Sequence, residues 1–257
     1  EFVLPVLMVY LLELTLWRNI WISISILIFI LLPTISYFLI KNLKFDSREI
    51  KDDQNINYKN IKQWNRSEVL KDFRFYIISL NVLAAPWIVT GIFVYQTFIL
   101  SSKNWGPYII AQSFMPYSVI SVLSLFLSGY LVDKFKSTKL LYFINIPLLI
   151  SMIILFNFDN PISSYFIFGI IGVTNGLCNV LGSSTWAEIY GVKHIGSIKA
   201  LTTGLMVFST AFGTALFGYL IDAGLNIENI SFICGTYILI TLFMLLIIRK
   251  KLKPRLI

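Results

Sequence analysis

The chain of 257 residues has few of the residue types on which most catalytic and metal sites depend. It has one histidine, His194, which excludes a zinc site of the HExxH kind because that motif needs two. No serine lies in a Gly-x-Ser-x-Gly motif, which excludes the nucleophile elbow of α/β-hydrolases. Its two cysteines, Cys178 and Cys234, lie in apolar runs and offer neither a disulfide framework nor a metal-ligand spacing. The composition therefore predicts that the protein binds no metal ion and no cofactor and is not an enzyme.

Charge is also missing from seven stretches of 19 to 29 residues. A helix needs about 20 apolar residues to cross the hydrocarbon core of a bilayer, where backbone polar groups must be paired within the segment. An eighth apolar segment, 2–16, is interrupted only by Glu13. The sequence thus predicts an all-α, polytopic membrane helical bundle with eight transmembrane helices. The charge-free stretches are 19–40, 75–102, 104–132, 140–158, 160–187, 200–221 and 229–248.

The basic residues are concentrated on every second connection between these stretches. One alternate set, which includes 41–74 and the tail from Arg249, carries 19 of the 21 Lys and Arg, and the other set carries only Arg18 and Lys103. The positive-inside rule places the richer set, and with it the C-terminus, in the cytoplasm. We therefore expect a multi-pass protein of a cell membrane, with a bacterial inner membrane as the favoured case. The net charge of +8 indicates contact with anionic lipid and not with nucleic acid.

The chain divides into three parts on this pattern. Residues 1–40 form two helices, 41–74 form a polar cytoplasmic loop, and 75–257 form six helices and the tail. The end of the loop, Trp64 to Phe75, mixes apolar and charged residues, which predicts an interfacial amphipathic helix. Four prolines lie inside the expected spans, where we expect them to kink helices; they are Pro33, Pro86, Pro116 and Pro147.

Neutral polar residues are the main candidates for a binding site, because the spans contain almost no charge. Asn175 and Asn179 lie one helical turn apart near the middle of 160–187, and a buried amide needs partners. They either line a polar cavity or bond a neighbouring helix. The stripe Gly169, Gly172 and Gly176 on the same helix predicts close helix packing. Further candidate substrate-binding residues are Asn81, Tyr95, Gln96 and Thr210, although a threonine often bonds only its own helix.

Two motifs lie at expected cytoplasmic helix ends. Gly129 and Asp133 are one turn apart, and Lys134 follows. Here the glycine would let a neighbouring helix approach, while the carboxylate would lie at the membrane surface near cations. The second motif is the string Trp186–Ile198, which contains Glu188. Both motifs are candidate parts of a cytoplasmic gate.

At these residues the chain resembles the major facilitator superfamily. Gly129-Tyr-Leu-Val-Asp133-Lys134 is similar to the C-half copy of that family's cytoplasmic G-x-x-x-D-R/K loop, and the layout of a long loop followed by six helices is similar to its second half. The loop departs from the family pattern at Lys136, where glycine is usual, and at Ser137, where arginine is usual. The string Trp186–Ile198, with Tyr95-Gln96, is similar to bacterial members near the monocarboxylate and oxalate/formate exchangers.

This resemblance implies a secondary active transporter of a small organic solute that works by alternating access, with a carboxylate as one candidate solute. The eight helices would be five to twelve of an expected twelve, and the carrier would act as a monomer. A coupling ion, the direction of transport and the solute itself stay open. Two other classes also stay open: a membrane enzyme with catalytic groups upstream, and a membrane scaffold or sensor without transport.

Overall fold

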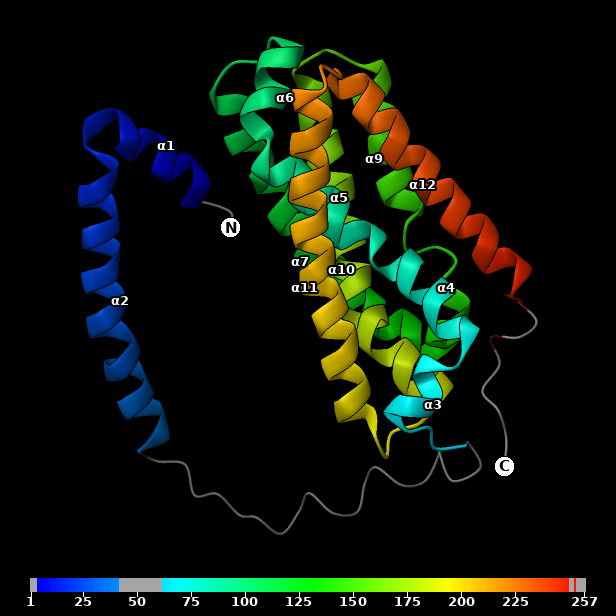
Figure 1. Cartoon of the computed structure of the whole chain (residues 1–257). Coiled ribbons are helices and arrows are strands. Elements are labelled where there is room, and N and C mark those ends of the chain that lie inside the picture. Colours follow the sequence, from blue (N-terminus) through cyan, green and yellow to red (C-terminus); the bar gives the residue numbers. More distant parts are fainter. Residues whose placement is uncertain (1–3, 42–61, 250–251, 253–257) are drawn as a thin grey trace. The chain divides into compact units, whose positions relative to one another are not determined.

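The structure, a computed structural model, describes residues 4–41, 62–249 and 252, and every regular element in these residues is a helix. The chain divides into two compact units, one of residues 3–59 and one that contains residues 60–257 (Figure 1). The first unit holds α1 (Leu4–Leu14) and α2 (Trp17–Ile40). The second holds α3 (Arg66–Leu70), α4 (Phe73–Val82), α5 (Ala84–Val94), α6 (Gln96–Lys103), α7 (Tyr108–Phe135), α8 (Ser137–Leu140), α9 (Ile146–Asn157), α10 (Ile162–Tyr190), α11 (Ile195–Asp222) and α12 (Ile227–Ile247).

In the first unit a very short turn, Thr15 and Leu16, joins the two helices. Helix α2 continues through Pro33, and its apolar side chains are mostly exposed; Phe29, for example, is 80% exposed. Because α2 is long and apolar enough to cross a bilayer, exposure of this kind is what a lipid-facing helix requires.

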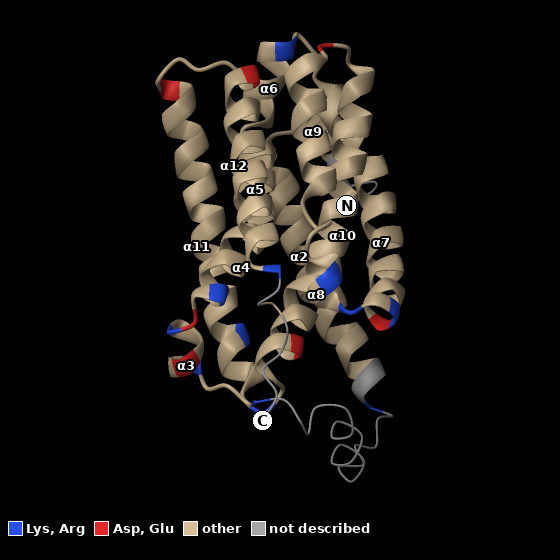
Figure 2. Cartoon of the chain, turned by 90° about the vertical axis from the view of Figure 1, so that its right-hand side faces the viewer, with Lys and Arg blue, Asp and Glu red and all other residues tan. Residues whose placement is uncertain are grey.

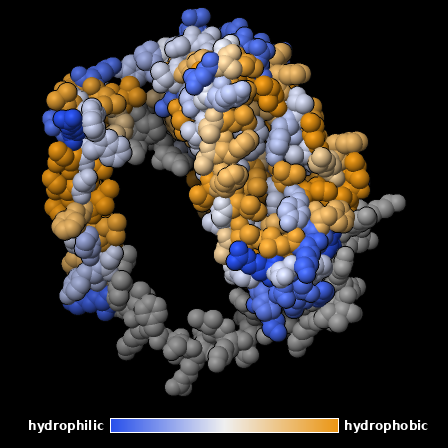
Figure 3. Space-filling view, viewed as in Figure 1, coloured by the Kyte–Doolittle hydropathy of each residue, from blue (hydrophilic) through white to orange (hydrophobic). Residues whose placement is uncertain are grey.

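In the second unit the long helices α7, α10, α11 and α12, and the α4–α5 pair, are each long and apolar enough to span a membrane. Charged side chains lie near the two ends of this unit (Figure 2), and hydrophobic residues cover the surface between them (Figure 3). We call the end that carries α3 and α8 the α3 end, and the opposite one the α6 end. The helices, with charged residues at the two ends and hydrophobic residues between them, confirm the prediction of an all-α membrane bundle.

The stretch 140–158 does not form the single spanning helix that the sequence predicts. It holds the end of α8, a turn at 141–145 and the 12-residue α9, so it is shorter than the other spans. Pro147 lies in the first turn of α9, where its missing N–H costs nothing. The proline therefore starts a helix and does not kink one. Most of the turn is buried in protein, as irregular backbone at membrane depth requires: Leu141 and Ile144 are at 0% exposure, and Phe143 is exposed.

The expected interfacial helix at Trp64–Phe75 is also different from the prediction. Only α3, five residues long, is helical before α4 begins, and Asn65 and Glu68 form a capping box at its start. Trp64, Val69 and Phe75 are buried in a hydrophobic cluster of the bundle. These three side chains therefore pack against protein, because the end of α10 supplies a partner surface that the sequence pattern does not reveal, whereas Leu70 and Phe73 are exposed.

Candidate functional site

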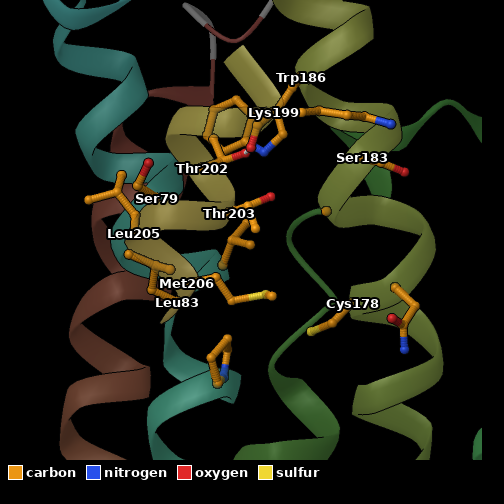
Figure 4. Close-up of a pocket in the computed structure, with 14 residues that line it drawn as sticks. Ser79, Leu83, Cys178, Ser183, Trp186, Lys199, Thr202, Thr203, Leu205 and Met206 are labelled. Atoms are coloured by element: carbon orange, nitrogen blue, oxygen red, sulfur yellow. Dashed lines mark hydrogen bonds between the residues drawn. The ribbon is translucent and has the colours of Figure 1, made fainter. Parts of the chain in front are cut away.

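A pocket of about 250 Å³ lies between α4, the start of α5, α10 and α11 (Figure 4). It includes Trp186 near the end of α10 and Lys199 near the start of α11, so it lies toward the α3 end. Leu83, Pro86, Cys178 and Met206 contribute apolar and sulfur surface. Its polar lining comes from all three sides and consists of Ser79 on α4, Asn179 and Ser183 on α10, and Lys199, Thr202 and Thr203 on α11.

Three of these polar side chains have donors to offer. The hydroxyl of Ser79 is buried without a hydrogen-bond partner. The structure gives no partner among the described residues for the Thr203 hydroxyl or the Lys199 ammonium group either. Lys199 is the one charged residue in the described lining, and no carboxylate lines the pocket there. Donors without an opposing negative group create a site that favours an anion.

The pocket owes its shape on the α4 side to a break in the helix. Pro86 has no N–H to donate to the carbonyl of Val82, and α4 ends at Val82, with Leu83 as its C-cap about one turn before the proline. Side chains of neighbouring elements donate to the carbonyls around the break. The bonds are Ser209 Oγ to Leu83 O at 3.0 Å, Tyr237 Oη to Leu80 O at 2.9 Å and Asn145 Nδ2 to Asn81 O at 2.6 Å.

On the α10 side, close packing against α7 sets the orientation of the helix. A Cβ added at Gly172 would lie 2.6 Å from the carbonyl oxygen of Tyr117, and one at Gly176 would lie 2.5 Å from the Cβ of Ser124. The glycine stripe therefore does pack against a neighbouring helix, as predicted. The facing stripe of buried serines on α7, which includes Ser121, was not recognised in the sequence, although its spacing of three and four residues could have revealed it.

The two asparagines of α10 have different environments. Asn175 Nδ2 donates to Ser121 Oγ at 2.8 Å, so this amide bonds a neighbouring helix, one of the two alternatives considered. Asn179 is exposed and lines the pocket, and its Nδ2 donates to the Asn175 carbonyl at 2.9 Å. Whether either residue contacts a solute stays a prediction.

The other candidate binding residues lie outside the pocket lining. Asn81 is fully buried beside Asn145. Tyr95 stacks on Phe217 at 6.4 Å, and Gln96 begins α6. Thr210 donates to Val207 O of its own helix at 2.7 Å, the local bond that competes with any binding role. Ser79, Lys199 and Thr203, which do line the pocket, were not chosen from the sequence. The spacing of Lys199, Thr203 and Met206 could have revealed one face of α11, but the position of Ser79 beside it could not.

The loop motif after α7 adopts an unusual backbone conformation. Asp133 and Lys134 are exposed, and no atom lies within 4 Å of a Cβ built on Gly129, so no helix of the described residues approaches that glycine. Lys136, where the family pattern has glycine, takes φ 68° and ψ 145°. That region is used almost only by glycine. The loop therefore makes the glycine-type turn in spite of the substitution.

Glu188 is a partner of this loop. Its carboxylate accepts hydrogen bonds from Ser137 Oγ at 2.5 Å, Thr138 Oγ1 at 2.7 Å and Thr138 N at 3.2 Å. The carboxylate at the end of α10 thus holds the chain just after the turn, where α8 begins. Ser137, the other departure from the family pattern, supplies one of these hydroxyls. The two cytoplasmic motifs predicted from the sequence are therefore in direct contact.

Comparison with known families agrees with this architecture. The model of the Major Facilitator Superfamily matches residues 2–214, which is most of the chain, and the chain belongs to that superfamily. No curated protein matches it. Members of the superfamily are transporters, so membership favours transport over the enzyme and scaffold alternatives. The narrower similarity to monocarboxylate and oxalate/formate exchangers stays a prediction.

Proposed function

We propose that the protein is a secondary active transporter of a small organic carboxylate and that the α4–α10–α11 pocket is part of its solute path. The observation that carries the proposal is the set of donors in the pocket: Lys199, Ser79 and Thr203 have no partner among the described residues. A carboxylate would accept from the Lys199 ammonium group, and a charge-assisted hydrogen bond of this kind is about twice as strong as a neutral one. The two hydroxyls are further donors in the lining.

The rest of the lining fits the other end of such a solute. Leu83, Pro86 and Met206 offer an apolar wall for a short carbon chain. The oxygen atoms of Asn179 and Ser183 would accept hydrogen bonds from hydroxyl groups on that chain. A volume of about 250 Å³ lies just below the range of drug-sized sites and restricts the solute to a few carbon atoms.

In the proposed cycle two helical bundles rock about the solute, and the pocket opens to one side of the membrane at a time. Asp133 and Glu188 would act at the gate of the α3 end, and the carrier would work as a monomer in a bacterial inner membrane. The 19-to-2 distribution of basic residues supports a cytoplasmic α3 end and C-terminus. Cysteine labelling tests this orientation: position 104 should react with an impermeant reagent in sealed cells. Position 55, which lies outside the described residues, should not.

The decisive experiment replaces the cation. Lys199→Gln should lower uptake of radiolabelled short carboxylates such as lactate, pyruvate or oxalate by about tenfold or more, the loss expected for one charge-assisted bond of about 1.5–3 kcal/mol. Lys199→Arg should retain part of the activity. The matched control is Lys193→Gln, which removes an exposed cation from the connection just before α11 and not from the pocket lining.

Two results would overturn the proposal. One is unchanged carboxylate uptake in a well-expressed Lys199→Gln protein. The other is uptake confined to neutral solutes in the unmodified protein. Equal losses in Lys199→Gln and Lys193→Gln would assign the effect to the positive charge of the α3 end in general and would also contradict a binding role for Lys199.

A further inference from the structure

The segment of residues 62–72, which we call the strap, lies across the α3 end and is attached to the end of α10. Trp64 N donates to the carbonyl of Tyr190 at 3.0 Å, and the two rings meet edge to face with centroids 5.5 Å apart. Trp64 is only 5% exposed. The strap is therefore docked through both its backbone and a large buried side chain.

A buried ion pair fixes the strap where it enters α4. Asp72 and Arg74 are 6% and 3% exposed, and their side chains meet at 2.7 Å. The Arg74 guanidinium lies over the rings of Trp64 and Tyr190, at 5.5 and 5.9 Å, and the Tyr190 hydroxyl donates to Asp72 at 3.3 Å. A charge pair taken out of water is stable only while its partners stay in place, so it favours one docked geometry over partial ones.

The strap also holds the connection between α10 and α11. Gln63 Oε1 accepts from the backbone N–H of Lys193 at 3.0 Å. The Gln63 amide lies directly over Gly191, which has φ 84° and no room for a Cβ. This connection leads into the first two turns of α11, which carry Lys199.

Contacts continue from the strap to the pocket. Trp186 lines the pocket, stacks on Tyr190 with centroids 6.1 Å apart, and meets Phe75 at 5.4 Å. The docked ring of Trp64 thus lies behind Tyr190, which lies behind Trp186. The three helices that line the pocket are joined at this end through one short segment.

We propose that the strap is a latch that controls access to the pocket: while it is docked it holds Trp186 and the start of α11 in the arrangement described, and its release opens the pocket. The inference rests on the proposed function only in treating the pocket as the solute site. Release is feasible because α3 is a single five-residue helix and because Asn65, Arg66 and Ser67 are exposed, features of segments that open locally. Trp64 and Gln63 would then be positioning residues that do not touch the solute.

Cys178 provides a direct measure of access, because it lines the pocket. In a Cys234→Ser background it is the one remaining thiol, and its alkylation by N-ethylmaleimide can be followed by mass spectrometry on the purified protein. Trp64→Leu keeps an apolar side chain but removes the ring contacts. It should accelerate alkylation at least about fivefold, the lower range of measured couplings between sites.

The control is Trp105→Leu. Trp105 is 6% exposed, and its Nε1 donates to the carbonyl of Asp159 at 2.6 Å. The same substitution far from the pocket should lower the melting temperature but leave the alkylation rate near that of the parent. Gln63→Ala is the second test variant, because it removes one bond to Lys193 without opening the core, and it should also accelerate alkylation.

Equal acceleration in Trp64→Leu and Trp105→Leu, or no acceleration in Gln63→Ala, would overturn the latch. If Trp64→Leu does not fold, Gln63→Ala decides alone. The readout needs no solute, so it is independent of the proposed function. Failure of short carboxylates to slow alkylation of the parent protein would count against carboxylate binding and leave the latch standing.

Discussion

Replacement of Gly176 by alanine tests the close approach of α7 and α10, on which the orientation of the pocket's α10 wall depends. The new Cβ would lie 2.5 Å from Ser124 Cβ, about 0.9 Å closer than the 3.4 Å at which ordinary contacts begin. It would also lie 2.7 Å from Leu125 N and 2.8 Å from Ser121 O, which are backbone atoms and cannot rotate away. The two helices must therefore move apart.

Overpacking of this kind costs about 1–3 kcal/mol. Alanine in place of a mid-helix glycine returns about 0.5–1 kcal/mol, so the net loss, taken at the middle of both ranges, should be about 1 kcal/mol. For a chain of this size each kcal/mol corresponds to roughly 2–4 °C, which gives a fall of about 2–4 °C in melting temperature. The measurement is thermal unfolding of the purified protein in detergent.

Gly182→Ala is the matched control on the same helix. No atom lies within 4 Å of a Cβ built there, so only the gain in helix propensity remains and the melting temperature should rise. The two substitutions should therefore have opposite signs. A Gly176→Ala protein as stable as the parent, or equal destabilisation by both changes, would refute the close approach of the helices.

Three further predictions concern the ends of the bundle. Lys136→Gly should stabilise the protein by about 1 kcal/mol and raise its melting temperature, because glycine adopts a positive φ without the strain that lysine has there. A lower melting temperature would contradict the strained turn. Burial lowers the pKa of Lys103, but its bonds to Asp159 and Glu228 outweigh burial and raise that pKa above its ordinary value. The stabilisation by this ion cluster should thus be complete below about pH 10.4, the pKa of lysine in the unfolded chain, and be lost as the pH rises through the higher pKa of the folded protein. Thermal unfolding should therefore show a melting temperature that falls over this pH range in the parent, and Lys103→Met should not show that fall. Asp133→Asn, at an exposed position, should leave the melting temperature unchanged and impair transport, and normal uptake would remove its role in the gate.

The sequence was sufficient for six of the eight predicted spans, since the described parts of 2–16 and 140–158 form helices of only 11 and 12 residues, and it was less so for the irregular backbone within the spans. Pro86 marks a helix break, but the break lies one turn earlier, at Leu83, because a proline disturbs the preceding turn. Pro147 looks the same in sequence and yet begins α9. The difference depends on the buried turn before it and on the side chain of Asn145, which reaches across to α4. No local pattern encodes that contact.

Among the candidate site residues, Asn179 lines the pocket, whereas Asn81 and Thr210 do not. A role of Asn179 in binding stays a prediction. Isolated polar residues in apolar runs are ambiguous for a physical reason. Each must find a hydrogen-bond partner in a medium without water, and a partner on its own helix satisfies it as well as one in a cavity does.

By itself the sequence determined that the chain is a multi-pass helical membrane protein, because a bilayer requires long charge-free segments and leaves the basic residues to the connections. Only the tertiary structure decided which faces meet. Ser79, Lys199 and Thr203 are up to 124 positions apart in the chain, and they line one pocket because a helix break, a glycine–serine interface and the first turns of α11 bring them together. Convergence of this kind depends on packing between helices, and packing is set by contacts distant in sequence.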